Sequence, residues 1–186
     1  MSEIDYLKYY WLEKDFFPEI YKYFHKEGIL TSEQFFSIIT WKSIRPRKRI
    51  KQGLLATGKS LNDAVKDLTM GIYSAKEKEK KLEIMLKQPG FQLAMASAIL
   101  TVLYPDIFSV YDFRVRGQLR DPKNDDRAYP DITYTINRIR RYFDEYITQV
   151  LQRGREISQN SELSLRDCDR LLWAKSWHEY LKEFFE

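Results

Sequence analysis

Cysteine and histidine are scarce in this chain, and their scarcity excludes several kinds of site. The sequence holds one cysteine, Cys168, and two histidines, His25 and His178, which lie far apart. One cysteine cannot form an internal disulfide, and a structural zinc site needs about four cysteine or histidine ligands. We therefore expect no metal site and no cofactor.

Long apolar runs are missing as well. The best candidate, Leu93 to Tyr104, is too short for a membrane span, which needs roughly 20 apolar residues. The N-terminal residues carry acids from residue 3 onward and lack the apolar run of a signal peptide. These absences predict a cytoplasmic protein with no membrane partner, and they leave its oligomeric state open.

Strand signals, internal repeats and low-complexity segments are also absent. Apolar residues recur instead at the i, i+3, i+4 spacing of helices, with Pro18 expected to kink or break the first helix and Gly154 to end a later one. The expected helices cover residues 6–24, 31–41, 60–72, 77–87, 91–104, 112–119, 132–154 and 164–181, with a loop at 121–131. The pattern predicts an all-α fold, and a length of 186 residues predicts one compact helical domain over 1–186.

The charges are unevenly placed. A formal net charge of +4 permits an anionic partner, and residues 41–51 contain cations without any acid. The cations of this run are Lys42, Arg45, Arg47, Lys48, Arg49 and Lys51. The run is either a phosphate-binding patch with Trp41 available to stack on a base, or an exposed basic helix face above a buried Trp41. Residues 76–81, by contrast, alternate lysine with glutamate and are expected to form a solvated face.

One stretch combines features that suit cleavage of a glycosidic bond. Pro89 and Gly90 form a turn before the apolar helix, and such a turn leaves backbone N–H groups that can hold a phosphate. Asp112 stands at the expected start of the next helix, where the helix dipole favours an ionised carboxylate. A carboxylate there can stabilise the oxocarbenium-like state of glycosidic cleavage or activate water.

This stretch resembles the core of the helix-hairpin-helix DNA glycosylases, the HhH-GPD superfamily. The family pattern is a Pro-Gly-x-Gly hairpin, an alanine-rich helix and an apolar pair that leads into an aspartate. Pro89 and Gly90 match the hairpin, Ala96 matches the helix alanine and Asp112 matches the acid. The resemblance covers residues 86–119. It implies a glycosylase-like core that binds double-stranded DNA, flips a damaged or modified base and hydrolyses its N-glycosidic bond with Asp112.

The chain departs from the family pattern at two positions. The second hairpin glycine is Gln92, which puts phosphate binding by the hairpin in question. The lysine of the lyase-competent members is Ala94, which cannot form a Schiff base. The resemblance therefore implies a monofunctional hydrolase without lyase activity. A C-terminal cluster of four cysteines is absent too, so the iron–sulfur cluster of some relatives is not expected.

These considerations define a candidate site. Asp112 is the expected catalytic residue, and Trp41, Tyr111 and Phe113 are candidate walls of a base pocket. Of the two aromatic residues that flank Asp112, we expect one to enter the core and the other to line a cleft. The candidate DNA contacts are Gly90, Phe91, Gln92, Arg45, Arg47, Lys48, Arg49 and Lys51.

A second interpretation stays open for the site and for the whole protein. Ser109 to Asp112 fits a capping box, in which the carboxylate serves only local hydrogen bonds. The protein would then be a non-enzymatic helical DNA- or protein-binding protein that retains the glycosylase core for packing. Gln92 is the residue that most favours this alternative.

Overall fold

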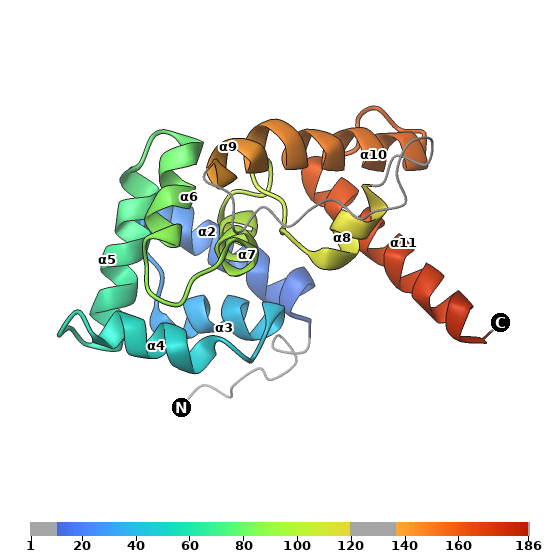
Figure 1. The fold of residues 1–186 in the computed structure, drawn as a ribbon. Helices are drawn as coiled ribbons and strands as arrows, with labels where there is room; N and C mark the ends of the chain where they lie inside the picture. The colour runs from blue at the N-terminus through green and yellow to red at the C-terminus, as the bar shows by residue number, and fades with distance from the viewer. Residues whose placement is uncertain (1–10, 120–136, 186) are drawn as a thin grey trace. The chain divides into compact units, whose positions relative to one another are not determined.

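The computed structural model describes residues 11–119 and 137–185, and every regular element among them is a helix (Figure 1). The predicted all-α class is thereby confirmed. The described residues divide into two compact units, one that runs to Phe91 and takes up Val102–Tyr104, and one that comprises Gln92–Thr101 and the residues from Pro105 onward. The single domain over 1–186 stays a prediction. The helix starts expected at residues 6 and 132 and the loop expected at 121–131 lie outside the described residues.

Unit 1 consists of consecutive helices whose ends follow local sequence signals. They are η1, a π-helical turn (Leu12–Phe16), α2 (Phe17–Glu27), α3 (Ser32–Lys42), α4 (Arg47–Leu55), α5 (Leu61–Ser74) and α6 (Lys78–Leu86). The helical run changes from the π-helical turn η1 to α2 at Phe17, beside Pro18, where an irregularity was expected. Pro18 occupies the first turn of α2, where a proline lacks no intrahelical hydrogen bond. Gly28 ends α2 in the left-handed region at φ 72°. Thr31 and Gln34 form the expected capping box of α3.

Residues 76–80 are exposed, as expected for a solvated face, and Lys81 is the exception. It is buried, and its ammonium donates to the carbonyl of Ile72 at 2.9 Å and to the carbonyl of Ala75. It also lies 3.2 Å from the hydroxyl of Tyr104. The lysine thus satisfies carbonyls at the C-terminal end of α5. Burial lowers the pKa of Lys81 and raises the pKa of Tyr104 to about 12.

Unit 2 contains the expected apolar helix and a longer helical run that follows it. Its elements are α7 (Leu93–Leu103, of which Val102 and Leu103 belong to unit 1), α8 (Phe113–Gln118), α9 (Arg138–Arg141), η2, a π-helical segment (Tyr142–Ile147), α10 (Thr148–Ser158) and α11 (Leu165–Phe185). Gly154 does not end its helix, which corrects the expectation. A Cβ at Gly154 would lie 2.5 Å from the Cβ of Cys168, so the glycine lets α10 and α11 approach closely.

No described helix is long and apolar enough to cross a membrane. Within residues 11–119 and 137–185, no three histidine, cysteine or acidic side chains gather to hold a metal ion.

Candidate functional site

The segment Ser109–Asp112 leads into α8 without regular secondary structure, and three of its four residues are buried. Side chains of unit 2 bind its backbone instead. The amides of Ser109, Val110 and Tyr111 donate to the hydroxyl of Tyr142 (3.1 Å), a carboxylate oxygen of Asp169 (3.4 Å) and the hydroxyl of Ser97 (2.9 Å). The buried backbone amides of Ser109, Val110 and Tyr111 are therefore satisfied, as buried backbone requires, whereas the buried Ser109 hydroxyl has no hydrogen-bond partner among the described residues.

Tyr142 and Tyr146 bind carbonyls of this segment. The hydroxyl of Tyr142 donates to the Ser109 carbonyl at 2.5 Å, and the hydroxyl of Tyr146 donates to the Val110 carbonyl at 2.7 Å. Burial raises the pKa of both hydroxyls well above the ordinary value of tyrosine. Both hydroxyls therefore stay protonated and donate to these carbonyls, and the Tyr142 hydroxyl also accepts the Ser109 amide.

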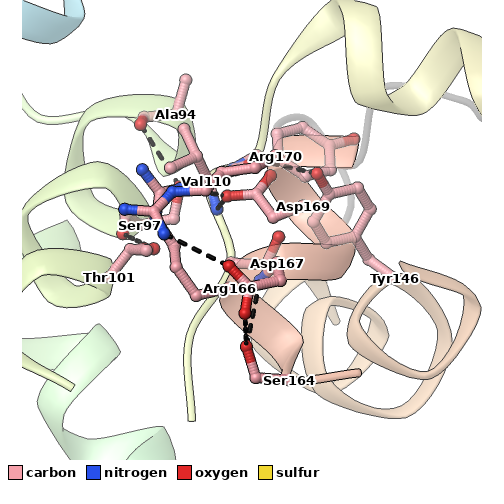
Figure 2. Close-up of polar contacts among 12 residues, drawn as sticks. Ala94, Ser97, Thr101, Val110, Tyr146, Ser164, Arg166, Asp167, Asp169 and Arg170 are labelled. Atoms are coloured by element: carbon pink, nitrogen blue, oxygen red, sulfur yellow. Dashed lines mark hydrogen bonds and ion pairs between the residues drawn. The ribbon is translucent and has the colours of Figure 1, made fainter. Parts of the chain in front are cut away.

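Asp169 supplies the one carboxylate of this arrangement. It is almost completely buried, and it pairs with Arg166 one turn earlier on α11 (Figure 2). Burial raises the pKa of the Asp169 carboxyl, and the Arg166 guanidinium opposes that rise. Figure 2 shows Asp169, Tyr146 and Ser97 arranged around Val110. We call the side chains of Ser97, Tyr142, Tyr146 and Asp169 the backbone clamp.

Asp112 ends the clamped segment and begins α8. Its Oδ1 accepts the amide of Arg114 at 2.8 Å, so Asp112 is itself the N-cap. This corrects the capping-box interpretation, in which Ser109 would be the cap and Asp112 would lie inside the helix. The carboxylate is half-buried and stands at the N-terminal end of α8, where the unsatisfied N–H groups favour negative charge.

The two aromatic residues beside Asp112 lie in different surroundings, as expected. Tyr111 is 3% exposed and packs edge-on against Tyr146 at 4.8 Å between ring centroids. Phe113 is 66% exposed. The ring of Tyr111 therefore belongs to the core of unit 2, and Phe113 is the flanking ring available to a ligand.

An aromatic surface of α11 lies beside α8 in unit 2. The rings of Trp173, Trp177 and Tyr180, here called the aromatic row, follow one another at centroid distances of 6.0 and 5.7 Å. They are 43%, 39% and 51% exposed. The guanidinium of Arg114 lies 4.4 Å from the Trp177 ring centroid and 5.1 Å from that of Phe113, within cation–π range.

In unit 1 the predicted cations form an exposed face at α4 and just before it. Five of these side chains, here called the basic face of α4, are exposed: Arg45, Arg47, Lys48, Arg49 and Lys51. None of them makes an ion pair with another described residue. Trp41 is neither fully buried nor free, because its half-buried ring packs edge-on against Phe17 at 5.1 Å.

The Pro89–Gly90 turn packs directly against α4. Gly90 has φ 88°, and a Cβ there would lie 3.3 Å from both the Cγ of Arg49 and the backbone nitrogen of Ile50. A Cβ at Gly53 would lie 2.8 Å from the Pro89 carbonyl oxygen. Arg49 also donates from Nη2 to the Gly90 carbonyl at 3.4 Å. The structure thus brings together two groups of candidate DNA contacts that are far apart in sequence.

The remaining predicted residues divide between core and surface. Phe91 is buried and packs edge-on against Phe35, and its amide donates to the Gln88 carbonyl at 3.3 Å, so its side chain lies in the core. Gln92 is exposed and its carbonyl accepts the Met95 and Ala96 amides of α7. The amide of Gly90 donates to no described residue, which keeps it compatible with phosphate binding.

Sequence reasoning missed the backbone clamp. The available signal was the placement of Tyr142 and Tyr146 four residues apart on the apolar face of one helix, since buried tyrosine hydroxyls need partners. Asp169 gave a second signal, as an acid between Cys168 and Leu172 on the face of α11 that is buried.

Comparisons with known proteins add no relative, because no family model, no curated protein and no solved structure matches this chain. The resemblance to the glycosylases therefore rests on the residues of 86–119 alone.

Proposed function

We propose that this protein binds double-stranded DNA through the basic face of α4 and the Pro89–Gly90 turn, and that it hydrolyses the N-glycosidic bond of a damaged or modified base with Asp112. The observation that carries the proposal is the packing of Gly90 on Arg49. It joins exposed cations to the turn that matches the glycosylase hairpin.

The basic face has the chemistry of a phosphate-binding surface. Its cations have no acidic partners among the described residues, so they need not exchange an internal ion pair for a phosphate. The neighbouring turn adds the Gly90 amide as a short donor that suits a phosphate oxygen. Neither group reads base edges, so binding is expected to be independent of sequence.

The surroundings of Asp112 support the hydrolytic half of the proposal. A carboxylate at a helix N-terminus suits the positive charge that develops on the sugar during glycosidic cleavage. Phe113 and the aromatic row offer exposed rings in the same unit, and an extruded base is held by such stacking. Arg114 adds a cation over these rings that is suited to the adjacent phosphate.

Ala94 supports a monofunctional reaction. The residue at the position of the family's lysine carries only a methyl group, and no amine is available there to attack the sugar. The product is then an intact strand with an abasic site, which is cut only after alkali or heat. Borohydride should trap no protein–DNA adduct.

One observation favours the non-enzymatic alternative. The Asp112 carboxylate already serves as the N-cap of α8, a role that would keep an aspartate there without any reaction. In that case the protein binds DNA through α4 and excises nothing.

A substrate screen separates the two functions. Duplexes that each carry one deaminated, oxidised, alkylated or hypermodified base are incubated with the protein and then treated with alkali. Strand cleavage that requires both the protein and alkali supports excision, and its loss in Asp112→Asn assigns the reaction to this carboxylate. Salt-sensitive binding without cleavage of any duplex would leave the non-enzymatic alternative.

A further inference from the structure

The backbone clamp brings side chains from three separate elements to one short segment. Ser97 comes from α7, Tyr142 and Tyr146 come from η2, and Asp169 comes from α11. Ser97 and both tyrosines are 0% exposed, and Asp169 is 2% exposed. Four buried polar groups are therefore committed to holding the backbone of Ser109–Asp112.

This arrangement is costly to build. Burial of a carboxylate and three hydroxyls is unfavourable unless every one is paired. A surface loop would connect α7 to α8 without those groups, because water would satisfy its backbone. The segment ends at Asp112. A rigid segment fixes the position of the Asp112 carboxylate, whereas a flexible loop would only connect α7 to α8.

Tyr146 acts closest to that carboxylate. Its hydroxyl donates to the Val110 carbonyl at 2.7 Å, so it anchors the backbone two residues before Asp112. Its ring packs against the Tyr111 ring. Tyr142 binds both backbone groups of Ser109, three residues before the carboxylate.

We infer that Tyr146 is a positioning residue for Asp112: its hydroxyl fixes the backbone from which the carboxylate projects, and the rest of the clamp supports it. The inference rests on the proposed base excision. Misplacement of a reacting group by about 1 Å can lower a rate roughly a hundredfold, so the loss of one backbone anchor should be measurable.

The test compares Tyr146→Phe with the matched control Tyr142→Phe. Each change removes one hydroxyl from a fully buried ring of η2. Single-turnover excision is measured on a duplex that the wild-type protein cleaves, together with duplex affinity. Tyr146→Phe should lower the excision rate about tenfold or more with unchanged affinity, whereas Tyr142→Phe should lower it less than about threefold. Equal losses in the two variants at equal melting temperature would show a general structural role and overturn the inference.

Failure of the proposed function gives a different pattern. If no duplex is cleaved, or if Asp112→Asn cleaves like the wild type, base excision by Asp112 is rejected. The placement of Asp112 is then tested by amide hydrogen exchange of Arg114, whose N–H donates to the Asp112 carboxylate. Exchange that accelerates at least tenfold in Tyr146→Phe and not in Tyr142→Phe supports the positioning role. Unchanged exchange overturns it.

A second variant covers the case in which Tyr146→Phe does not fold. Ser97→Ala removes the acceptor of the Tyr111 amide with little change of volume. It should lower the excision rate and accelerate Arg114 exchange in the same direction. A Ser97→Ala protein with wild-type values for both would contradict a clamp that sets Asp112.

Discussion

The basic face of α4 gives the sharpest test of DNA binding. Arg47 and Lys48 are exposed at the start of α4 and have no ion-pair partner among the described residues. Alanine favours helix, so an Arg47→Ala/Lys48→Ala double variant should keep α4 intact. Arg49 is left unchanged because it also binds the Gly90 carbonyl, and its loss would disturb the turn.

The expected effect follows from the release of counterions. Each phosphate neutralised by the protein contributes about 0.9 to the slope of log affinity against log salt, so loss of two contacts should flatten the slope by about 1.8. Between 50 and 200 mM salt, the wild-type protein should then lose about twelvefold more affinity than the variant. Fluorescence anisotropy of a labelled duplex over a salt series measures both slopes.

A charge-matched control separates contact from overall charge. Lys78→Ala/Lys80→Ala removes the same two charges from α6 in the same unit, at side chains that are 49% and 54% exposed and paired with glutamates. Its slope should stay within about 0.5 of the wild-type value if the control lysines touch no phosphate. Parallel lines for the wild-type protein and the α4 variant would refute the assignment of this face to DNA.

Three further results are expected. Asp112→Asn should abolish excision with DNA affinity retained, since a lost charge partner costs several kcal/mol of barrier while asparagine still caps α8; excision near the wild-type rate would contradict this. Gly154→Ala should destabilise the fold by about 1–3 kcal/mol in chemical denaturation, because its Cβ would lie 2.5 Å from that of Cys168, whereas Gly117→Ala, with nothing within 4 Å, should not destabilise. Asp169 has a folded pKa raised above its unfolded value, so its contribution to stability is present below the unfolded pKa and lost as pH rises through the folded pKa. The stability of the wild type relative to Asp169→Asn should therefore fall over that window, and a difference that rises with pH would show the opposite shift.

The helical fold was predictable because residues close in sequence determine where many of its helices begin and end. Gly28 must adopt a positive φ, and Thr31 with Gln34 forms a capping box, so both are visible without tertiary information. Gly154 shows where such reasoning fails. A glycine within a helix can also be required by close packing. At Gly154, Cys168 occupies the space that a side chain would need.

Burial was harder to predict than helicity. Lys81 lies in a charged run that is typical of a solvated helix face. Its side chain is nevertheless buried, because its ammonium donates to a backbone carbonyl near the C-terminal end of α5. Trp173 and Trp177 have the spacing of core residues, yet both stay substantially exposed. Lys81 binds carbonyls of the preceding helix end, and the two tryptophans stack on each other near Arg114; periodicity carries no information about either arrangement.

Part of the candidate site was visible in the sequence for a related reason. Asp112 and the cations near α4 are conspicuous as residue types; Asp112 is half-buried at the start of α8, and five of the cations are exposed. The clamp was not visible, because its hydrogen bonds join residues such as Ser109 and Tyr142, which lie 33 positions apart. A tyrosine on an apolar face predicts only that its hydroxyl needs a partner, not which backbone group that partner is.

The cap and the proposed reaction at Asp112 make compatible demands on one carboxylate. The Arg114 amide donates to Oδ1, so the side chain acts there as an acceptor at the positive end of α8. An acceptor suits stabilisation of a cationic sugar or orientation of water, and it does not suit proton donation to a leaving base. The cap bond also fixes the direction of the carboxylate relative to α8, while the clamp fixes the backbone before it. Both the backbone before Asp112 and the carboxylate itself are therefore fixed. Such preorganisation is required of a group that stabilises a developing charge.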